Sequence, residues 1–409
     1  MIISKPMALF INPNWENLSL IRSYIAHGYY VIGFGTSSAF FNLSLDEYHP
    51  IHGHANDYQA IFDISNLYDV ESIVSDNCDY SLLVSETMSS LMGKPSLGVG
   101  AAKISNNKLK QRILADKAGI KQPMYLHCNS ERDIHEFIKL VSKPILVKPS
   151  DSRGSMGITY LKLSSTSHEI VESICHCLSA SPSGSYLVEE FIDGDLYTID
   201  GFLVDNYLYL VGVASRERTG KGRTVTREIF YKSSLDKNFL EKCYSFLLDV
   251  ATAFSYSNGH IHCEAILIPD GDLYLVECTN RGAGVFTSST INPYISDCDI
   301  NSMFIALKSN NGFCVNSKQG SIILANKRDA SLLFPSLGDN GEVLERFDLD
   351  SVKSMSLVLD AYLFAKIGRP LPLSIDGPSR HIAIALKTSD KSEIGNIMSE
   401  IKSKYVSVS

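Results

Sequence analysis

The sequence feature that most constrains the fold is the dipeptide Asp270-Gly271, which separates two apolar segments. Residues 260–264 read His-Ile-His-Cys-Glu, and residues 274–281 read Tyr-Leu-Val-Glu-Cys-Thr-Asn-Arg. Asp-Gly favours the tight turn of a two-residue β-hairpin, so the two segments are predicted to pair as antiparallel strands. In this register three pairs of residues lie opposite each other: Glu264 and Glu277, His262 and Thr279, and His260 and Arg281.

Glu264 and Glu277 are the informative pair in this hairpin. Side chains two residues apart share one face of a strand, so all six paired side chains are expected on the same side. Two carboxylates that face each other across a strand pair repel, and a divalent cation between them would remove that repulsion. Oxygen ligands suit Mg²⁺, with Mn²⁺ as an alternative, and such an ion can carry the phosphates of a nucleotide. The hairpin therefore predicts a phosphoryl-transfer site, with the Thr279 hydroxyl as a further candidate ligand.

The expected surroundings of the two acids favour a metal over ordinary surface glutamates. Four apolar residues are predicted on the same face, which would leave the acids partly buried and in need of a partner. These residues are Ile266, Ile268, Leu273 and Leu275. Arg281 precedes Gly282-Ala283-Gly284, and it offers a planar fork for phosphate or carboxylate. A zinc hydrolase that uses His260, His262 and Glu264 is a second interpretation, and the role of both histidines stays open.

A second phosphate-binding signal lies at Lys148. This lysine follows an apolar strand predicted at 145–147 and precedes a loop of small residues at 149–157. Backbone N–H groups of a flexible Gly/Ser loop can close over phosphates, while a lysine ammonium neutralises them. The loop lacks the Gly-Lys-Ser/Thr ending of a P-loop.

Residues 216–227 form a basic segment that is predicted to be a loop. Its basic residues are Arg216, Arg218, Lys221, Arg223 and Arg227. A mobile basic loop can close over a polyanion, so one or two of these residues could be functional. Simple solvation is the equally favoured interpretation for most of them.

Composition narrows the class of protein. The chain has 409 residues, of which 44% are hydrophobic and 20% charged, so a globular protein of two to four domains is expected. A net charge of −8 and a pI near 5.8 argue against a nucleic-acid-binding surface. No apolar run approaches the roughly 20 residues that span a bilayer, and nine irregularly spaced cysteines are typical of reduced thiols. We expect a cytoplasmic protein with neither a membrane nor a nucleic-acid partner.

The order of predicted elements divides the chain into four parts. Alternation of strands and helices predicts an N-terminal, Rossmann-like parallel α/β domain over residues 1–103. Residues 104–192 carry Lys148 and its loop, and residues 193–308 carry the hairpin. Residues 309–409 are predicted to form a C-terminal α+β domain.

Together these elements resemble the ATP-grasp superfamily of carboxylate–amine ligases, and among its branches the L-amino acid ligases. The resemblance covers about residues 104–305 and depends on the order of its motifs. These are a helix opened by Asn107-Lys108, Lys148 before the Ser/Gly loop, Glu189-Glu190-Phe191-Ile192, Glu264, and Glu277-x-Thr279-x-Arg281. The resemblance implies a multidomain α/β and α+β protein, in which 104–192 and 193–308 are the two α+β subdomains of one ATP-grasp fold.

The resemblance also implies a role for each motif. Lys108 and Lys148 would contact the phosphates of ATP, and Arg281 would steady an acyl phosphate or the incoming carboxylate, which makes Lys148 and Arg281 the candidate catalytic residues. The other candidate ATP-binding residues are Ser152, Gly154, Ser155, Met156, Glu189, Glu190, Phe191 and Ile192, the last four as a hinge whose backbone meets adenine. The candidate metal ligands are Glu264, Glu277 and Thr279.

Two positions depart from the pattern that the resemblance implies. Thr279 stands where the family usually has Asn, and Leu196 stands where many members have a ribose-binding glutamate. Asp195 or Asp200 could replace that glutamate.

The implied function is an ATP-dependent ligase that forms a dipeptide-type amide through an acyl phosphate and releases ADP and phosphate. Its partners would be a small-molecule carboxylate such as an amino acid, an amine, and a second copy of the chain in a homodimer. The alternatives are a biotin-carboxylase-like enzyme and a nucleotide-binding protein with weak or no catalysis.

Overall fold

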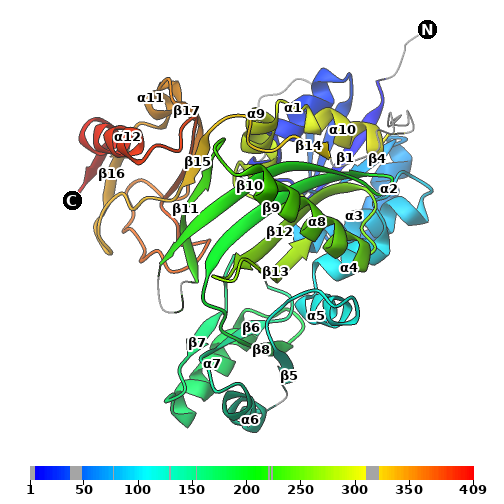
Figure 1. The fold of residues 1–409 in the computed structure, drawn as a ribbon. Coiled ribbons are helices and arrows are strands. Elements are labelled where there is room, and N and C mark those ends of the chain that lie inside the picture. The colour runs from blue at the N-terminus through cyan, green and yellow to red at the C-terminus, as the bar shows by residue number, and fades with distance from the viewer. Residues whose placement is uncertain are drawn as a thin grey trace.

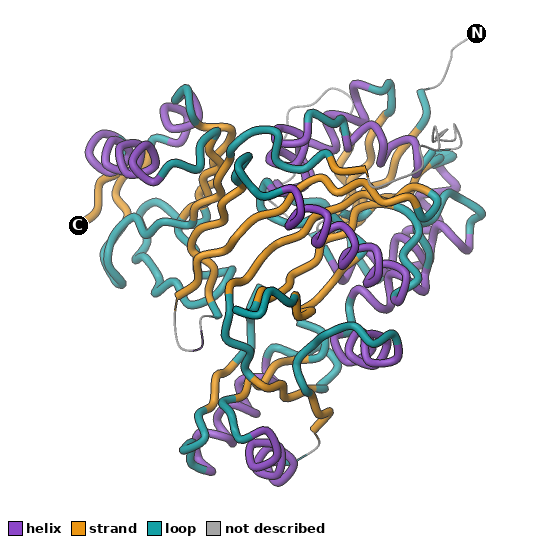
Figure 2. Tube along the Cα trace, in the orientation of Figure 1, coloured by secondary structure: helices purple, strands orange, loops and turns teal. Residues whose placement is uncertain are grey.

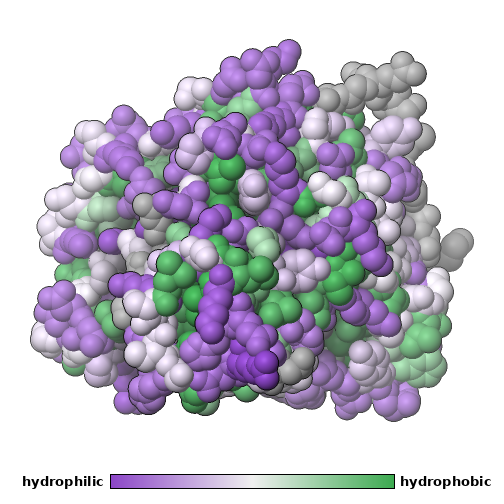
Figure 3. Space-filling view, turned by 60° about the horizontal axis from the view of Figure 1, so that its bottom comes forward, coloured by the Kyte–Doolittle hydropathy of each residue, from purple (hydrophilic) through white to green (hydrophobic). Residues whose placement is uncertain are grey.

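The computed structural model describes residues 5–36, 48–76, 78–128, 130–152, 154–219, 222, 224–309 and 322–409. They form a large central sheet with two four-stranded sheets beside it (Figure 1). Strands run through the middle of the molecule and most helices lie around them (Figure 2). Hydrophilic and apolar residues are mixed over the face seen in Figure 3. Among the described residues no helix has the length and hydrophobicity to cross a bilayer.

The N-terminal part is a parallel sheet covered by helices on both faces, as the sequence predicted. Its strands are β1 (Met7–Ile11), β2 (Tyr30–Gly35), β3 (Tyr48–His52) and β4 (Ser72–Val74), and its helices are α1 (Leu18–Ala26), α2 (Tyr58–Leu67) and α3 (Asp79–Leu91). The strand order is β3-β2-β1-β4. Within β1, Phe10 packs in the cluster of Tyr24 from α1, whereas Leu9 packs in the cluster of Ile61 from α2. Both faces of the strand are buried, which explains its continuous apolar run.

A small antiparallel sheet of order β5-β8-β6-β7 follows the N-terminal part (lower part of Figure 1). Its elements, with the two helices that lead into it, are α4 (Val99–Ser105), α5 (Lys108–Lys117), β5 (Tyr125–Cys128), α6 (Glu131–Val141), β6 (Ile145–Pro149), β7 (Thr159–Leu161), α7 (Ser167–Ser179) and β8 (Tyr186–Glu190). Helices α6 and α7 cover one face, where Val147 and Val188 are buried. Lys148 therefore points to the opposite face, because alternate residues of a strand point to opposite sides. The sequence predicted that Lys148 follows the strand, whereas the structure places it within β6.

In the part of the chain that the structure describes, the large sheet has nine strands. They are β9 (Asp195–Val204), β10 (Tyr207–Thr219), β11 (Val225–Tyr231), β12 (Gly259–Leu267), β13 (Leu273–Thr279), β14 (Ile322–Ile323), β15 (Ala330–Leu333), β17 (Val358–Leu363) and β18 (Ile382–Leu386). The main order is β13-β12-β9-β10-β11-β15-β18-β17, and β14 pairs with β10. Helix α8 (Lys237–Ala253) packs Leu247 and Val250 against Ile261 and Cys263 on one face. The other face carries the acidic pair.

The β12–β13 hairpin confirms the predicted register at the acids. Glu264 pairs with Glu277, and His262 pairs with Thr279. A bulge follows, so that Ala265 pairs with Leu275. Because of the extra residue, the β13 side chains between the bulge and the turn point to the opposite side of the sheet from the one predicted. Leu273 and Leu275 are therefore buried against α8, and the prediction that they share a face with the acids was wrong.

The basic segment is mostly strand, which corrects the prediction of a loop. Arg216 and Arg218 lie on β10, and Arg227 lies on β11. Lys221, Arg223 and also Arg153 of the Ser/Gly loop lie outside the described residues.

C-terminal strands extend the large sheet beyond β11. Strand β15 pairs with β11 and β18, and β17 pairs with β18. The remaining elements of the chain are η1 (Trp15–Asn17), η4 (Thr287–Ile291), α9 (Asn292–Ser296), α10 (Ile300–Leu307), β16 (Leu344–Phe347), α11 (Leu349–Ser354), α12 (Lys391–Lys404) and β19 (Val406–Val408). Helix α12 packs Ile394, Ile397 and Ile401 into a core with the strands at this end of the sheet.

Candidate active site

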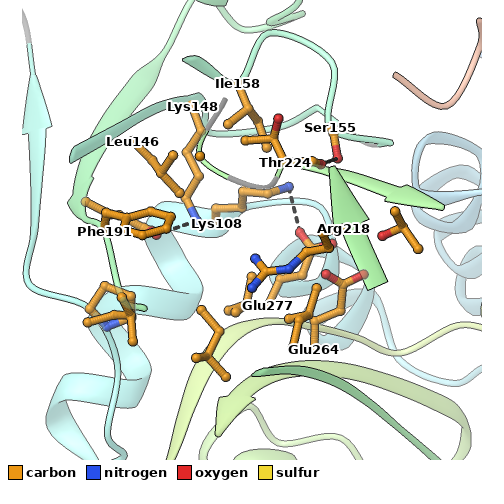
Figure 4. A pocket seen from close by; sticks show the side chains of 18 of the residues that line it. Lys108, Leu146, Lys148, Ser155, Ile158, Phe191, Arg218, Thr224, Glu264 and Glu277 are labelled. Carbon is orange, nitrogen blue, oxygen red and sulfur yellow. Dashed lines mark hydrogen bonds and ion pairs between the residues drawn. The ribbon is translucent and has the colours of Figure 1, made fainter. Parts of the chain in front are cut away.

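A cavity lies between the small sheet and the acid-bearing face of the large sheet (Figure 4). It encloses about 1120 Å³ of empty space including its open mouth. From the small sheet and the elements near it, the candidate residues that line the cavity are Lys108, Lys148, Ser152, Gly154, Ser155, Met156, Glu189, Glu190, Phe191 and Ile192. From the large sheet, Glu264 and Glu277 line it. Segments more than 150 residues apart in sequence thus meet at one site.

Lys148 belongs to a buried ion network. Its Nζ lies 2.5 Å from Oε2 of Glu189, whose Oε1 lies 2.6 Å from Nε of Arg112. Arg112 also donates to the backbone oxygen of Val276 at 2.6 Å, so it joins α5 to both sheets. Burial lowers the pKa of Lys148 to about 8, although the charge of Glu189 opposes that shift. Burial disfavours the charge of Glu189 too, but Arg112 and Lys148 together hold the pKa of its carboxyl below the ordinary value.

Lys108 connects the acidic pair with the Ser/Gly loop. It opens α5, where Asn107 caps the helix by accepting a hydrogen bond from the N–H of Lys110. Nζ of Lys108 lies 2.9 Å from Oε2 of Glu277 (Figure 4). The same Nζ donates to the backbone oxygen of Ser152 at 2.7 Å. The lysine thus neutralises Glu277 and holds the start of the loop.

Glu264 is surrounded by cationic groups. Nη1 of Arg216 lies 2.6 Å from its Oε1, and Nε2 of His262 lies 3.7 Å from the same oxygen. His262 in turn places Nδ1 2.6 Å from Oδ1 of Asp200. Burial opposes the charges of both groups, yet Asp200 raises the pKa of His262 to about 9, and Arg216 keeps the pKa of the Glu264 carboxyl below its ordinary value.

These contacts correct one step of the sequence argument. A divalent cation is not the only group that can relieve the repulsion between Glu264 and Glu277, because Arg216 and Lys108 each neutralise one of them. These two cations can therefore relieve the repulsion between the acids, and a bound metal would exchange places with them.

The residues present nevertheless fit a magnesium site. Oγ1 of Thr279, beside the pair, is buried and has no hydrogen-bond partner among the described residues. Two carboxylates and a hydroxyl are hard oxygen donors, and Mg²⁺ is commonly held by one or two carboxylates with waters and phosphates completing its shell. Within the described chain no three His, Cys, Asp or Glu side chains are grouped to hold a metal, so such an ion would need ligands from a substrate.

The two histidines have separate environments. His260 is buried against Phe202 and Phe304, with ring centroids 5.0 and 5.4 Å away, and it does not line this cavity. Burial lowers its pKa. His262 is held by Asp200, as described above. This arrangement does not favour the zinc site that would combine both histidines with Glu264.

The Ser/Gly loop is held over the cavity from two sides. Oγ of Ser155 donates to the backbone oxygen of Thr224 at 2.9 Å. The N–H of Gly377 donates to the backbone oxygen of Gly154 at 3.1 Å. Gly154 and Ser155 both have positive φ, 60° and 62°, a conformation that glycine adopts without strain. Oγ of Ser152 is buried and lacks a hydrogen-bond partner among the described residues. The loop therefore offers an unused hydroxyl to a ligand.

The far end of the cavity is apolar. Leu146, Ile158, Phe191, Ile192 and Leu196 line it. In the stretch 189–192, the N–H of Glu190 donates to Met124 and that of Phe191 to Pro144. The N–H of Ile192 has no hydrogen-bond partner among the described residues. A flat ring with an acceptor atom would fit this slot.

A second cavity continues from the first. Lys108, Glu264 and Glu277 line both, whereas Thr279 and Arg281 line the second alone. Arg281 donates to the backbone oxygen of Gly282 at 2.9 Å, and Asp76 accepts the N–H of Gly282. The two acids thus lie where the cavities meet, and Arg281 lies in the second cavity.

Comparison with known proteins identifies the fold that builds these cavities. Residues 141–289, which include Lys148, the Ser/Gly loop and both acids, match the family described as ATP-grasp domain. The protein contains an ATP-grasp domain. The resemblance inferred from the sequence is therefore confirmed for this part of the chain.

The likeness of this chain to solved structures extends beyond residues 141–289. An L-amino acid ligase from Bacillus licheniformis superposes with a TM-score of 0.77 at 16% identity, covering 99% of this chain and 98% of that chain. The biotin carboxylase domain of a 2-oxoglutarate carboxylase from Hydrogenobacter thermophilus gives a TM-score of 0.76 at 14% identity, covering 99% and 91%. At such identities the likeness establishes the fold alone.

Curated relatives match the ATP-grasp region over part of their length. An alanine–anticapsin ligase from Bacillus amyloliquefaciens is 22% identical over 246 residues, which are 55% of this chain and 51% of that protein. The arginine-specific large chain of carbamoyl phosphate synthase from Schizosaccharomyces pombe is 22% identical over 286 residues, 67% of this chain and 24% of its own. The chain thus spans about half, or less, of the curated relatives that it matches.

The arginines at the site that were not assigned a specific role from the sequence are Arg112, Arg216, Arg218 and Arg380. Arg216 was noted within the basic segment, which was predicted to be a loop, so its place on β10 beside Glu264 was not predicted. Arg112 and Arg380 carry no local motif. Arg380 lies about 100 residues beyond the hairpin, so no local sequence pattern connects it with the acids.

Proposed function

We propose that this protein is an ATP-dependent ligase that joins the carboxylate of a small molecule, such as an amino acid, to an amine, with release of ADP and phosphate. The observation that carries the proposal is the continuity of the two cavities at Lys108, Glu264 and Glu277. A nucleotide in the first cavity can meet a second small molecule at the acidic pair.

ATP would lie with its base in the apolar slot and its phosphates toward the lysines. The Ile192 N–H, which has no acceptor among the residues that the structure describes, would donate to adenine, and Phe191 and Leu146 line the slot. Lys148 and Lys108 would neutralise the phosphates, and Ser152 with its loop would cover them. Lys108 would exchange its Glu277 partner for phosphate oxygens. Mg²⁺, held by Glu264, Glu277 and the Thr279 hydroxyl, would supply further neutralisation of phosphate charge.

The reaction needs two displacements. A carboxylate oxygen attacks the γ-phosphorus, the bond to the bridging oxygen breaks, and ADP leaves with that electron pair. The amine nitrogen then attacks the carbonyl carbon of the acyl phosphate, inorganic phosphate leaves, and the amine loses a proton to solvent. The side chains here position the groups and balance their charge, which is the main part of catalysis in phosphoryl transfer.

The finer features of the proposal have separate support. The full-length likeness to an L-amino acid ligase supports amino acids as substrates and a dipeptide-type product. It also supports the division into an N-terminal domain (1–103), two ATP-grasp subdomains (104–192 and 193–308) and a C-terminal part (309–409). Arg281 lines the second cavity and is proposed to contact the acyl phosphate there.

The test is phosphate release from MgATP in the presence of L-amino acids, singly and in pairs, with products identified by mass spectrometry. Glu277→Gln should lower turnover by roughly 100-fold or more, because it removes a carboxylate from the metal and phosphate site. A chelator of divalent metals should stop turnover. Glu136→Gln, on the exposed surface of α6, is the matched control and should leave turnover unchanged.

Other outcomes would support the alternatives. Phosphate release that depends on bicarbonate and not on amines would favour the biotin-carboxylase-like enzyme. Tight ATP binding without phosphate release in any mixture would favour a nucleotide-binding protein.

A further inference from the structure

Arg380 lies at the junction of the two cavities and, among the described residues, makes no hydrogen bond or ion pair with an acidic side chain. It precedes β18 and lines both spaces. No described residue accepts a hydrogen bond from its guanidinium or forms an ion pair with it, and its Nε is buried. Arg216, the other arginine that lines both cavities, is paired with Glu264.

The position of Arg380 is held by its surroundings. Its guanidinium carbon lies 3.5 Å from the ring centroid of Phe334, so the planar group stacks on the aromatic face. The preceding turn is closed by Asp376 and Ser379, since Oδ1 of Asp376 accepts the Ser379 N–H at 3.0 Å. Gly377 in the same turn is bonded to the Ser/Gly loop. The arginine is therefore preorganised beside the loop that would cover the phosphates.

The electrostatics of Arg380 favour an anion beside its guanidinium. Burial, and then the charge of Arg216, lower the pKa of its guanidinium to about 10, although the more distant charges of Glu16, Asp376 and Glu264 oppose that shift. A charge withdrawn from water costs free energy unless it is paired. A carboxylate supplies two oxygens in the geometry of the guanidinium fork.

The second cavity also indicates which anion this is. The lysines proposed for ATP phosphates belong to α5 and the small sheet, whereas Arg380 comes from the C-terminal part of the large sheet. Around it the second cavity has an apolar wall that includes Trp15, Phe334 and Phe364. A small organic acid fits a cation beside an apolar wall better than a polyphosphate does.

We propose that Arg380 binds the carboxylate of the small substrate and holds it beside the acidic pair for attack on ATP. The proposal rests on the proposed function for the identity of this ligand as the substrate.

The first test needs no ligand. Arg380→Met replaces the cation by an apolar chain that can still pack on Phe334, so the midpoint of thermal unfolding of the ligand-free protein should rise. Arg328→Met is the matched control: Arg328 lies on the surface, over the ring of Tyr294 and paired with Asp297, and its loss should leave the midpoint unchanged or lower it slightly. A fall in the midpoint for Arg380→Met would show a structural role and overturn the proposal.

The second test measures binding without turnover. Each proteinogenic L-amino acid is added to the protein with Mg²⁺ and a non-hydrolysable ATP analogue, and thermal stabilisation and affinity are recorded. At least one amino acid should stabilise the wild type, and its amide, which lacks the carboxylate, should not. Arg380→Gln should weaken that binding by roughly 30-fold or more and leave the affinity for the ATP analogue unchanged. Arg380→Lys, which keeps the charge without the fork, should restore part of the binding.

The outcomes separate this proposal from the proposed function. If no amino acid binds, if the amide binds equally well, or if Arg380→Gln retains binding or weakens the ATP analogue instead, the assignment of Arg380 is overturned. If amino-acid binding depends on Arg380 but no phosphate is released in the turnover screen, the carboxylate site stands and the ligase function fails.

Discussion

Glu264, Glu277 and Lys148 each have an opposite charge of the protein beside them before any ligand is added. Glu264 faces Arg216, Glu277 faces Lys108, and Lys148 faces Glu189. MgATP would therefore bind by exchange of partners, because its metal would compete for the acids and its phosphates for the lysines. The net gain from such exchange is smaller than from binding to isolated charges, since each group already has a partner.

If Lys148 contacts the phosphates of ATP as proposed, ATP binding is expected to depend on pH. Its pKa in the ligand-free protein is lowered to about 8 by burial, so the ammonium is lost as the pH rises through that value. Bound phosphates favour the charged form and raise the pKa again, so binding above this pH requires proton uptake. The affinity for MgATP should be constant below about pH 7 and fall by up to roughly tenfold per pH unit above about pH 8.

Calorimetric titration of a non-hydrolysable ATP analogue across this range checks the prediction. Lys148→Met should bind more weakly at neutral pH and lose the alkaline decline. Lys143→Met is the control, because Lys143 is largely exposed and pairs with Glu190. An alkaline decline that persists in Lys148→Met would assign it to another group.

At the level of single residues, the sequence identified the groups that local patterns mark. Glu264 and Glu277 follow from the Asp-Gly turn and the two-residue period, and Lys148 follows from a strand that ends in a small-residue loop. Arg112 carries no such mark, because a mid-helix arginine has the same local pattern whether it is solvated or, as here, buried against Glu189. Its role depends on tertiary packing that one sequence does not encode locally.

Among the elements, the β12–β13 hairpin shows where local reasoning ends. The turn fixed the register near the acids, but the bulge after Glu264 shifted the pairing by one residue and turned Leu273 and Leu275 to the α8 side. The shift serves packing, because both leucines are buried there. The basic segment shows the same limit: Arg216 and Arg218 are polar residues on a strand, held there by pairing between β10 and β11.

The turn of this hairpin can be tested by paired glycine substitutions. Gly271 has φ of +87°, so Gly271→Ala should lower the free energy of unfolding by about 1 kcal/mol through backbone strain. Gly395 lies inside α12 with open space around its Cα, so Gly395→Ala should raise the free energy of unfolding by roughly 0.5–1 kcal/mol. Urea denaturation of both variants measures the opposite signs. Equal effects at the two positions would show that the turn at Gly271 is not strained by a side chain.

Across the whole molecule, the second cavity is assembled from parts that are remote in sequence. Trp15 from the N-terminal part stacks on Tyr362 of β17, with ring centroids 3.9 Å apart and the planes 7° from parallel. Phe286, which follows the hairpin, meets Trp15 edge-on at 5.1 Å. The small-sheet side of the site contacts the C-terminal part through Gly154 and Gly377. The two acids come from one hairpin, but the shape of the cavity beside them depends on segments that are far apart in the sequence.

Trp15 is therefore expected to select the small substrate and not the nucleotide. It lines the second cavity and is absent from the lining of the first. Trp15→Ala should raise KM for the small substrate by roughly 10-fold or more, because loss of a large apolar contact removes about 1–3 kcal/mol of binding. KM for ATP should stay within about twofold, since the nucleotide would bind beyond the acidic pair. Steady-state kinetics with each substrate varied in turn measures both values. Tyr58→Ala, at an exposed aromatic position on α2, controls for a general loss of stability and should change neither. Equal increases in both KM values would show that Trp15 supports the fold of the whole site, whereas an unchanged KM for the small substrate would place that substrate away from the aromatic wall.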